Sequence, residues 1–79
     1  MREEVLEKII EKAVALWNAD ADACGEDTEF ASFNPKSSHY SAMTTFLEDE
    51  FDAEVPYLKF KKCATFGEAA DYVAELLDE

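Results

Sequence analysis

Apolar residues at three- and four-residue spacing constrain the fold of this chain more than any other feature. Over residues 1–18 they alternate with acids and with Lys8, which take the other faces of the predicted helix. This period is that of an amphipathic helix, so we expect one helix over residues 1–18. The apolar set is Val5, Leu6, Ile9, Ile10, Ala13, Val14, Leu16 and Trp17.

A second helical pattern closes the chain and has the clearest start signal. Thr65 is a good N-cap residue, and Glu68 follows three residues later, which is the spacing of a capping box. The apolar residues that follow are Ala69, Ala70, Val73, Leu76 and Leu77. We therefore expect the last helix to begin at Thr65.

The stretch of residues 19–36 has no such period. Asp20, Gly25 and Pro35 are turn or loop formers, which predicts a long first loop. A loop of this length in a small domain needs anchors. Phe30 and Phe33 are expected to hold it against the core.

Two further helices are predicted between the loop and Thr65. The first begins near Ser37 or Ser38, both good N-cap residues, and runs to about Phe51. Val55-Pro56 ends the pattern, because proline disfavours helix for the residue before it. Residues 57–63 then have room for only a short helix.

Length and composition fit one small helical domain, residues 1–79. The chain has only two glycines and two prolines, and 48% of its residues are apolar. These values are typical of a globular chain that is neither disordered nor rich in tight β-turns. We expect an all-α four-helix bundle of three longer helices and one short helix, with a long first loop.

Charge and cysteine usage limit the partners and the compartment. Nineteen acids against seven bases give a formal net charge of −12, which repels nucleic acid and anionic membranes and favours basic partner surfaces. Cys24 and Cys63 lie far apart and form no CxxC motif, and there is no signal peptide or long apolar run. These features favour a reduced, cytoplasmic protein, and we expect a monomer that inserts into no membrane.

Two segments resemble the acyl carrier protein family in one ungapped register. Residues 47–56, Leu-Glu-Asp-Glu-Phe-Asp-Ala-Glu-Val-Pro, are similar to the acidic end of that family's second helix and the Val-Pro that follows it. Residues 65–73, Thr-Phe-Gly-Glu-Ala-Ala-Asp-Tyr-Val, resemble its last helix. The resemblance covers nearly the whole chain. It implies a carrier rather than an enzyme, with acyl groups held as thioesters on 4'-phosphopantetheine that comes from coenzyme A.

Counting back in the same register places the family's modified serine at Ser37, with Ser38 as the alternative. Lys36 stands where the family has aspartate, and Ser38 and His39 also depart from the family's pattern. Independently, a helix N-terminus favours a phosphodiester, and Lys36 would add to this preference. His39 is interpreted as an exposed residue near the arm's phosphate. The plain alternative for either serine is an ordinary helix cap.

The resemblance also implies partners and a slot for the acyl chain. The expected partners are a phosphopantetheinyl transferase and enzymes that load or transfer acyl groups. These partners would recognise the carrier through Glu48, Asp49 and Glu50. Lys59, Lys61 and Lys62 lie where the family is usually acidic, so they indicate either a specialised fatty-acid, lipid or polyketide pathway or simply a solvated face. The slot, or equally an empty core, would be lined by Phe33, Met43, Leu47, Phe60, Cys63 and Val73.

The sequence supports other functions less well. Asp20, Asp22 and Gly25 begin like a calcium-binding loop, but Ala31 stands where a bidentate glutamate belongs, so no metal site is predicted. Adjacent serines and a histidine diverge on a helix, so no catalytic residue is predicted. The second hypothesis is an unmodified helical interaction module, because a transferase that reads Asp-Ser-Leu could reject Lys36-Ser37-Ser38.

Overall fold

The structure, a computed structural model, describes residues 2–78 and confirms the predicted order of elements. No strand occurs among these residues, and only one isolated antiparallel bridge, between Glu29 and Thr65, is present. The ends of the predicted first helix and of the predicted domain, Met1 and Glu79, lie outside the described residues. The elements are α1 (Arg2–Trp17), η1 (Ala21–Ala23), η2 (Phe30–Phe33), α2 (Ser37–Phe51), α3 (Tyr57–Lys61) and α4 (Phe66–Leu77).

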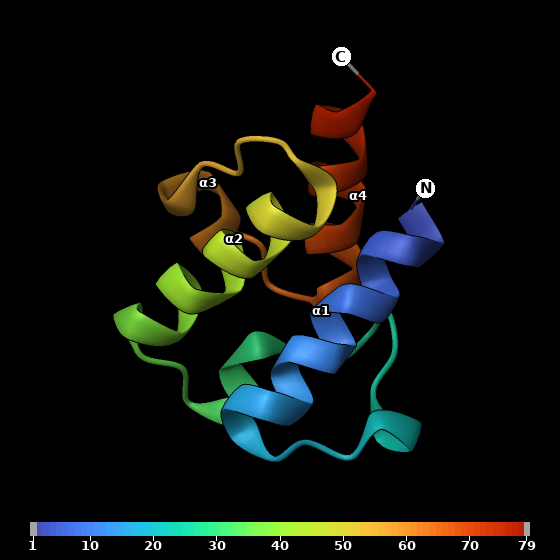
Figure 1. The fold of residues 1–79 in the computed structure, drawn as a ribbon. Coiled ribbons are helices and arrows are strands. Elements are labelled where there is room, and N and C mark those ends of the chain that lie inside the picture. Colours follow the sequence, from blue (N-terminus) through green and yellow to red (C-terminus); the bar gives the residue numbers. More distant parts are fainter. Residues whose placement is uncertain (1, 79) are drawn as a thin grey trace.

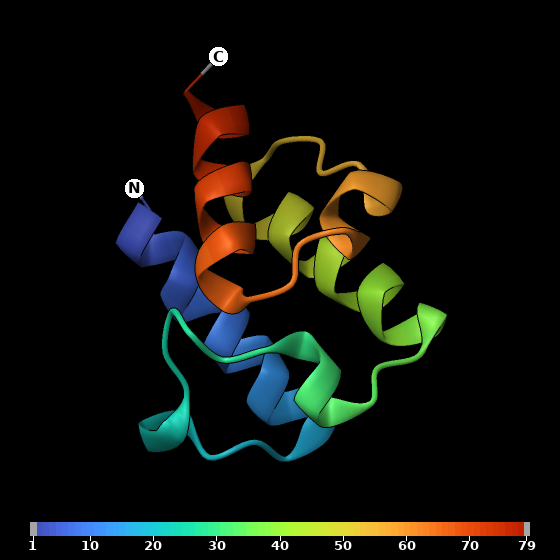
Figure 2. The same cartoon turned by 180° about the vertical axis from the view of Figure 1, so that it is seen from behind.

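Helix α1 is central to the bundle, because it packs against both α4 and α2, while α3 packs on α2 (Figure 1). The start of α1 and the end of α4 lie at one end of the molecule in both views (Figures 1 and 2). Arg2 joins these two helices through an ion pair with Asp71, and it also pairs with Glu26 of the first loop. The first turn of α2 lies at the periphery in both views.

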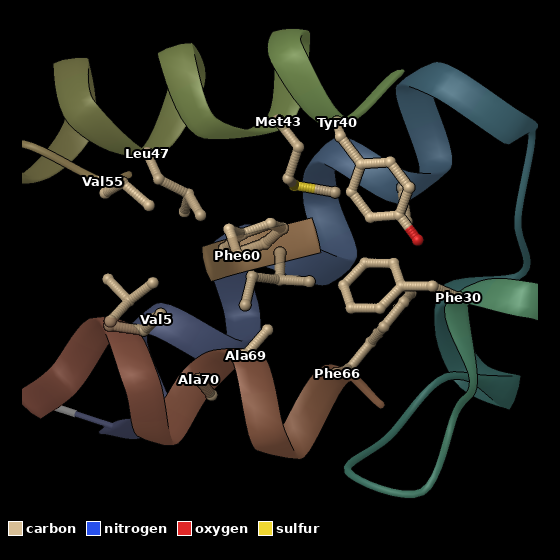
Figure 3. Packing of buried hydrophobic residues seen from close by; sticks show 13 residues of the cluster. Val5, Phe30, Tyr40, Met43, Leu47, Val55, Phe60, Phe66, Ala69 and Ala70 are labelled. Atoms are coloured by element: carbon tan, nitrogen blue, oxygen red, sulfur yellow. The ribbon is translucent and has the colours of Figure 1, made fainter. Parts of the chain in front are cut away.

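Three phenylalanines form the centre of the core (Figure 3). Phe30 comes from the first loop, Phe60 from α3 and Phe66 from the start of α4, and all three are fully buried. The Phe30 ring lies 4.8 Å from Phe66 and 5.8 Å from Phe60, measured between centroids. Burial of each such side chain stabilises a fold by roughly 1.5–3 kcal/mol. The short α3 is therefore held mainly by Phe60.

The first loop is anchored as predicted, and its backbone adds to the attachment. Phe30 is 1% exposed, and Phe33 packs half-buried against the same core. The backbone amides of Phe66 and Gly67 donate to the carbonyls of Thr28 and Glu26, each at 2.9 Å, and Phe30 donates to Ala64 at 3.1 Å. The loop is thereby fixed against the start of α4, although it contains only two short 3-10 turns.

One predicted helix start agrees with the structure, and another does not. Thr65 caps α4 as expected, since its hydroxyl accepts a hydrogen bond from the Glu68 amide at 3.1 Å. The expected serine cap of α2 is wrong: the N-cap is Lys36, and Ser37 is already the first helical residue. Asp20 uses its carboxylate to cap η1, accepting from the Asp22 amide at 3.0 Å.

Of the helices that the structure describes, none is both long enough and apolar enough to cross a membrane.

Candidate functional site

Ser37 lies exposed at the first turn of α2 with a free hydroxyl. No hydrogen bond joins its side chain to any of residues 2–78. Its carbonyl oxygen accepts a hydrogen bond from the Tyr57 hydroxyl at 3.4 Å, which attaches the start of α3 to the start of α2. Because the serine does not cap the helix, its hydroxyl is available for other chemistry.

The start of α2 is capped by a histidine instead. The backbone amide of Lys36 donates to His39 Nδ1 at 3.0 Å, while the Lys36 carbonyl accepts from the His39 amide at 3.0 Å. The amides of Ser37 and Ser38 have no acceptor within the described chain. Unpaired amides and the helix dipole make this end of α2 favourable for an anion.

His39 is half-buried, which corrects the expectation that it is exposed. The indole N–H of Trp17 also donates to its Nδ1, at 3.0 Å. Because both contacts have Nδ1 as the acceptor, the ring N–H is assigned to Nε2. His39 therefore connects the end of α1 to the start of α2, and any contact with an arm's phosphate would have to come from Nε2.

An aromatic stack lies beneath this cap. Trp17 stacks on Phe33 with the ring centroids 5.0 Å apart and an interplanar angle of 7°, and Phe33 in turn lies 6.0 Å from Phe66. The Trp17 ring also meets His39 edge-on at 5.4 Å. Ser37 is thus carried on a helix end that is braced by the first loop and by α1.

The two candidate serines face different sides of α2. Ser37 precedes the buried residues Tyr40 and Thr44 by three and seven positions, so it lies above the core-facing stripe on the α3 side. Ser38 lies one residue further round the helix, in a groove on the α1 side that also includes Lys12 and Phe46. An arm would therefore leave the molecule in a different direction from each serine.

A second groove lies between the first loop, α2 and α3, and has a volume of about 540 Å³. Tyr40, which lies below Ser37 on α2, forms part of its wall. Cys63, Lys61 and Lys62 line the α3 side. Partial burial, with a smaller contribution from Glu68, raises the pKa of the Cys63 thiol above its usual range.

A known protein is similar in sequence to this chain along almost its whole length. An acyl carrier protein of Picosynechococcus sp. is 30% identical over 76 residues, which cover 95% of this chain and 94% of the relative. The chain belongs to the acyl carrier protein family. No family model matches the chain. Members of this family are carriers and not enzymes, in agreement with the expected class.

The three acids that the carrier resemblance assigns to partners have unequal surroundings. Glu48 is half-buried and accepts a hydrogen bond from the Val55 amide at 2.9 Å, so it is less accessible than its two neighbours. Glu50 lies 3.7 Å from Lys8 of α1. Asp49 is exposed and forms no ion pair within the described residues. Of the three, Asp49 is the most available to a partner.

The lysines of α3 are all exposed. Lys61 lies over the Tyr57 ring at 5.9 Å from its centroid, and Lys59 borders a pocket with Tyr72 and Glu75. None of Lys59, Lys61 and Lys62 forms an ion pair with a described residue. The structure therefore leaves their charges open to solvent or to a partner.

The six residues predicted to line an acyl slot belong to one packed cluster. Met43, Leu47, Phe60 and Val73 are fully buried, while Phe33 and Cys63 are half-buried at its edge. Figure 3 shows Met43 and Leu47 of α2 directed toward Phe60. The structure brings the predicted set together, as a closed core.

Three contacts of the site have no sequence signal that would have predicted them. Trp17 follows the apolar pattern of α1, and only the fold shows that its indole holds His39. Tyr57 similarly looks like an ordinary aromatic residue after Pro56, although it contacts Ser37. Glu48 belongs to an acidic run whose members look alike, and its bond to Val55 depends on the path of the chain after α2.

Proposed function

We propose that this chain carries acyl groups as thioesters on a 4'-phosphopantetheine arm attached to Ser37. The proposal rests mainly on the free, exposed hydroxyl of Ser37, which lies on a helix end whose first two amides are unpaired. Membership of the acyl carrier protein family supports the same role. Carriage then needs no catalytic group on this chain.

The residues around Ser37 are suited to hold a phosphodiester. The amides of Ser37 and Ser38 would donate to its oxygens, and the exposed Lys36 side chain can approach it from the N-cap position. Each such contact with an exposed anion is worth about 0.3–1 kcal/mol. The arm supplies the thiol that forms the thioester, and a transferase would install the arm by transfer from coenzyme A.

An acyl chain would enter the bundle beside α3. The closed core has no free volume to spare in a well-packed protein, so Phe60 and its neighbours would have to separate. Helix α3 spans only Tyr57–Lys61 and depends on few contacts, which makes it the element that can move at least cost. Phe33 and Cys63, at the edge of the cluster, would then lie at the mouth of the slot.

The experiment is an intact mass measurement after incubation with coenzyme A and a broad-specificity phosphopantetheinyl transferase. The wild-type chain should gain the mass of one phosphopantetheine group. Ser37→Ala should gain none, whereas Ser38→Ala should gain it as the wild type does. Modification that is lost in Ser38→Ala and retained in Ser37→Ala would move the arm to the groove on the α1 side.

A second candidate function is an unmodified interaction module of the carrier fold. It is favoured by one observation: Lys36-Ser37-Ser38 stands in place of the acid, serine and leucine typical of the family. No added mass on the wild type, beside a control carrier that is modified, would support this second function against the first.

We further propose that the carrier serves a specialised fatty-acid, lipid or polyketide pathway as a cytoplasmic monomer. Lys36 at the cap of α2, and the three lysines in and directly after α3, support this, because they oppose recognition by basic enzyme surfaces. A housekeeping acyltransferase should load the modified wild type poorly and a Lys36→Asp variant better. Equal and efficient loading of both would contradict specialisation through this face.

A further inference from the structure

The acids of this chain are absent from two long segments of the sequence. Residues 30–47 and residues 55–67 contain no aspartate or glutamate, although the chain has nineteen acids. The same two segments contain four of the seven basic residues. The remaining part holds all nineteen acids and the other three bases, a formal charge of −16.

The fold brings these two segments together around the start of α2. Tyr57 contacts Ser37 at 3.4 Å, and Lys61, Lys62, Asn34 and Tyr40 line one groove. We call this surface, formed by η2, the first part of α2 and α3, the basic face. Its four lysines are Lys36, Lys59, Lys61 and Lys62.

Glu29 lines the groove of Lys61 and Lys62, and Glu75 borders a pocket with Lys59, yet none of the four lysines forms an ion pair with a described residue. Arg2 and Lys8, in contrast, form ion pairs with acids from other elements. A lysine that served only to relieve excess negative charge would be placed among the acids, as Lys8 is. The clustering therefore indicates a surface that is kept positive while the rest of the chain is strongly negative.

Screening by salt limits which charges of the chain act on a docked partner. Charges are screened over about 8 Å at physiological ionic strength. The described chain extends over 31 × 23 × 19 Å, so acids on the opposite side of the molecule lie beyond that range from a surface in contact with the basic face. A partner at this face therefore responds to the local excess of lysines more than to the net charge of −12.

The basic face also includes an exposed apolar residue. Leu58, in the middle of α3, is 71% exposed and is flanked in sequence by Tyr57 and Lys59. Protein interfaces commonly combine a buried apolar anchor with a charged rim. Leu58 and the surrounding lysines have this arrangement.

We propose that the basic face docks an acidic surface of a partner protein, which thereby approaches the carrier at Ser37. This inference rests on the proposed function only for the role of the partner as an enzyme that uses the arm. The net charge of the chain favours basic partners, whereas the basic face around Ser37 favours an acidic one. Nucleic acid is the disfavoured occupant, because it would bring a long run of phosphates close to the acidic remainder.

The test is an NMR titration of the isotope-labelled full chain, without the arm, at low ionic strength. Binding is followed through the backbone amide resonances as peptide is added. A glutamate-rich helical peptide with one central leucine should shift resonances of residues 33–40 and 57–63. Its lysine-rich counterpart should shift resonances of the acidic remainder. The absence of shifts in the basic face with the glutamate peptide would overturn the proposal. So would a single-stranded oligonucleotide that shifts the same residues at lower concentration.

Matched variants separate local from overall charge. Lys36→Gln/Lys62→Gln and the control Ala15→Glu/Ala23→Glu both lower the net charge by two, at exposed positions inside and outside the basic face. The first should weaken binding of the glutamate peptide roughly fivefold, and the control should weaken it much less. Equal weakening would contradict a local site. Since the assay involves no prosthetic group, its outcome is independent of the mass measurement on Ser37.

Discussion

Ser37 and Ser38 are adjacent and equally exposed, yet α2 turns them toward different neighbours. Ser37 lies above Tyr40 on the α3 side, and Ser38 lines the groove with Lys12. Capping of α2 by Lys36 and His39 leaves both hydroxyls free. The two serines have the same chemistry, so they differ as attachment sites only in the direction in which an arm would leave the molecule.

Gly67 shows how closely the first loop approaches α4. A Cβ at this position would lie 2.9 Å from the carbonyl oxygen of Glu26, which is bonded to the Gly67 amide. Gly67→Ala should therefore lower the free energy of unfolding by about 1–3 kcal/mol in urea titrations. Gly25→Ala, where a Cβ meets nothing within 4 Å, should change it by less than about 1 kcal/mol. A similar cost for both would contradict the close approach.

The thiols of this chain should react more slowly than the thiol of an attached arm. Burial is the largest cause of the raised pKa of both Cys24 and Cys63, so at mildly alkaline pH a smaller fraction of each is thiolate than in a free peptide. Timed alkylation followed by peptide mass analysis should label the arm first. The rates at Cys24 and Cys63 should still be rising with pH where a free cysteine peptide levels off. Labelling of either cysteine ahead of the arm would contradict this order.

Among the elements, the start of α2 depends on a contact from α1. His39 Nδ1 accepts from both the Trp17 indole and the Lys36 amide. His39→Ala would leave both donors without this acceptor, and we expect it to lower the free energy of unfolding by about 1–2 kcal/mol. Thr45→Ala, at an exposed position of the same helix, should stay within about 0.5 kcal/mol of the wild type.

Hydrogen exchange of backbone amides tests whether His39 stabilises the start of α2 locally. In His39→Ala the amides of the first turns of α2 should exchange faster, while those of α4 change little. Uniformly faster exchange would contradict a local capping role and would indicate general loss of stability.

For the whole molecule, excess negative charge is the main electrostatic feature. Nineteen acids face seven bases, and only Arg2 and Lys8 form ion pairs within the described chain. Exposed pairs contribute at most about 1 kcal/mol each, so screening of repulsion should outweigh screening of attraction. The urea midpoint should rise with added sodium chloride, and equally with potassium chloride. A midpoint that falls with salt would show that the ion pairs dominate.

The sequence predicted the helices well because their signals are local. The period of α1, the Thr65 cap and the Val55-Pro56 stop each depend on neighbouring residues, and all three agree with the structure. The cap of α2 was missed because a histidine three residues into the helix, held by a tryptophan 22 residues earlier, replaces the usual serine. The unequal surroundings of Glu48 and Glu50 likewise follow from tertiary contacts.

The measurement that tests the central claim most directly is fragmentation mass spectrometry of the wild-type chain after modification. Backbone cleavage between Ser37 and Ser38 separates the two candidates. We expect the added phosphopantetheine mass on the N-terminal fragment that ends at Ser37. The mass on the complementary fragment, which begins at Ser38, or an unmodified chain beside a working control, would contradict the assignment.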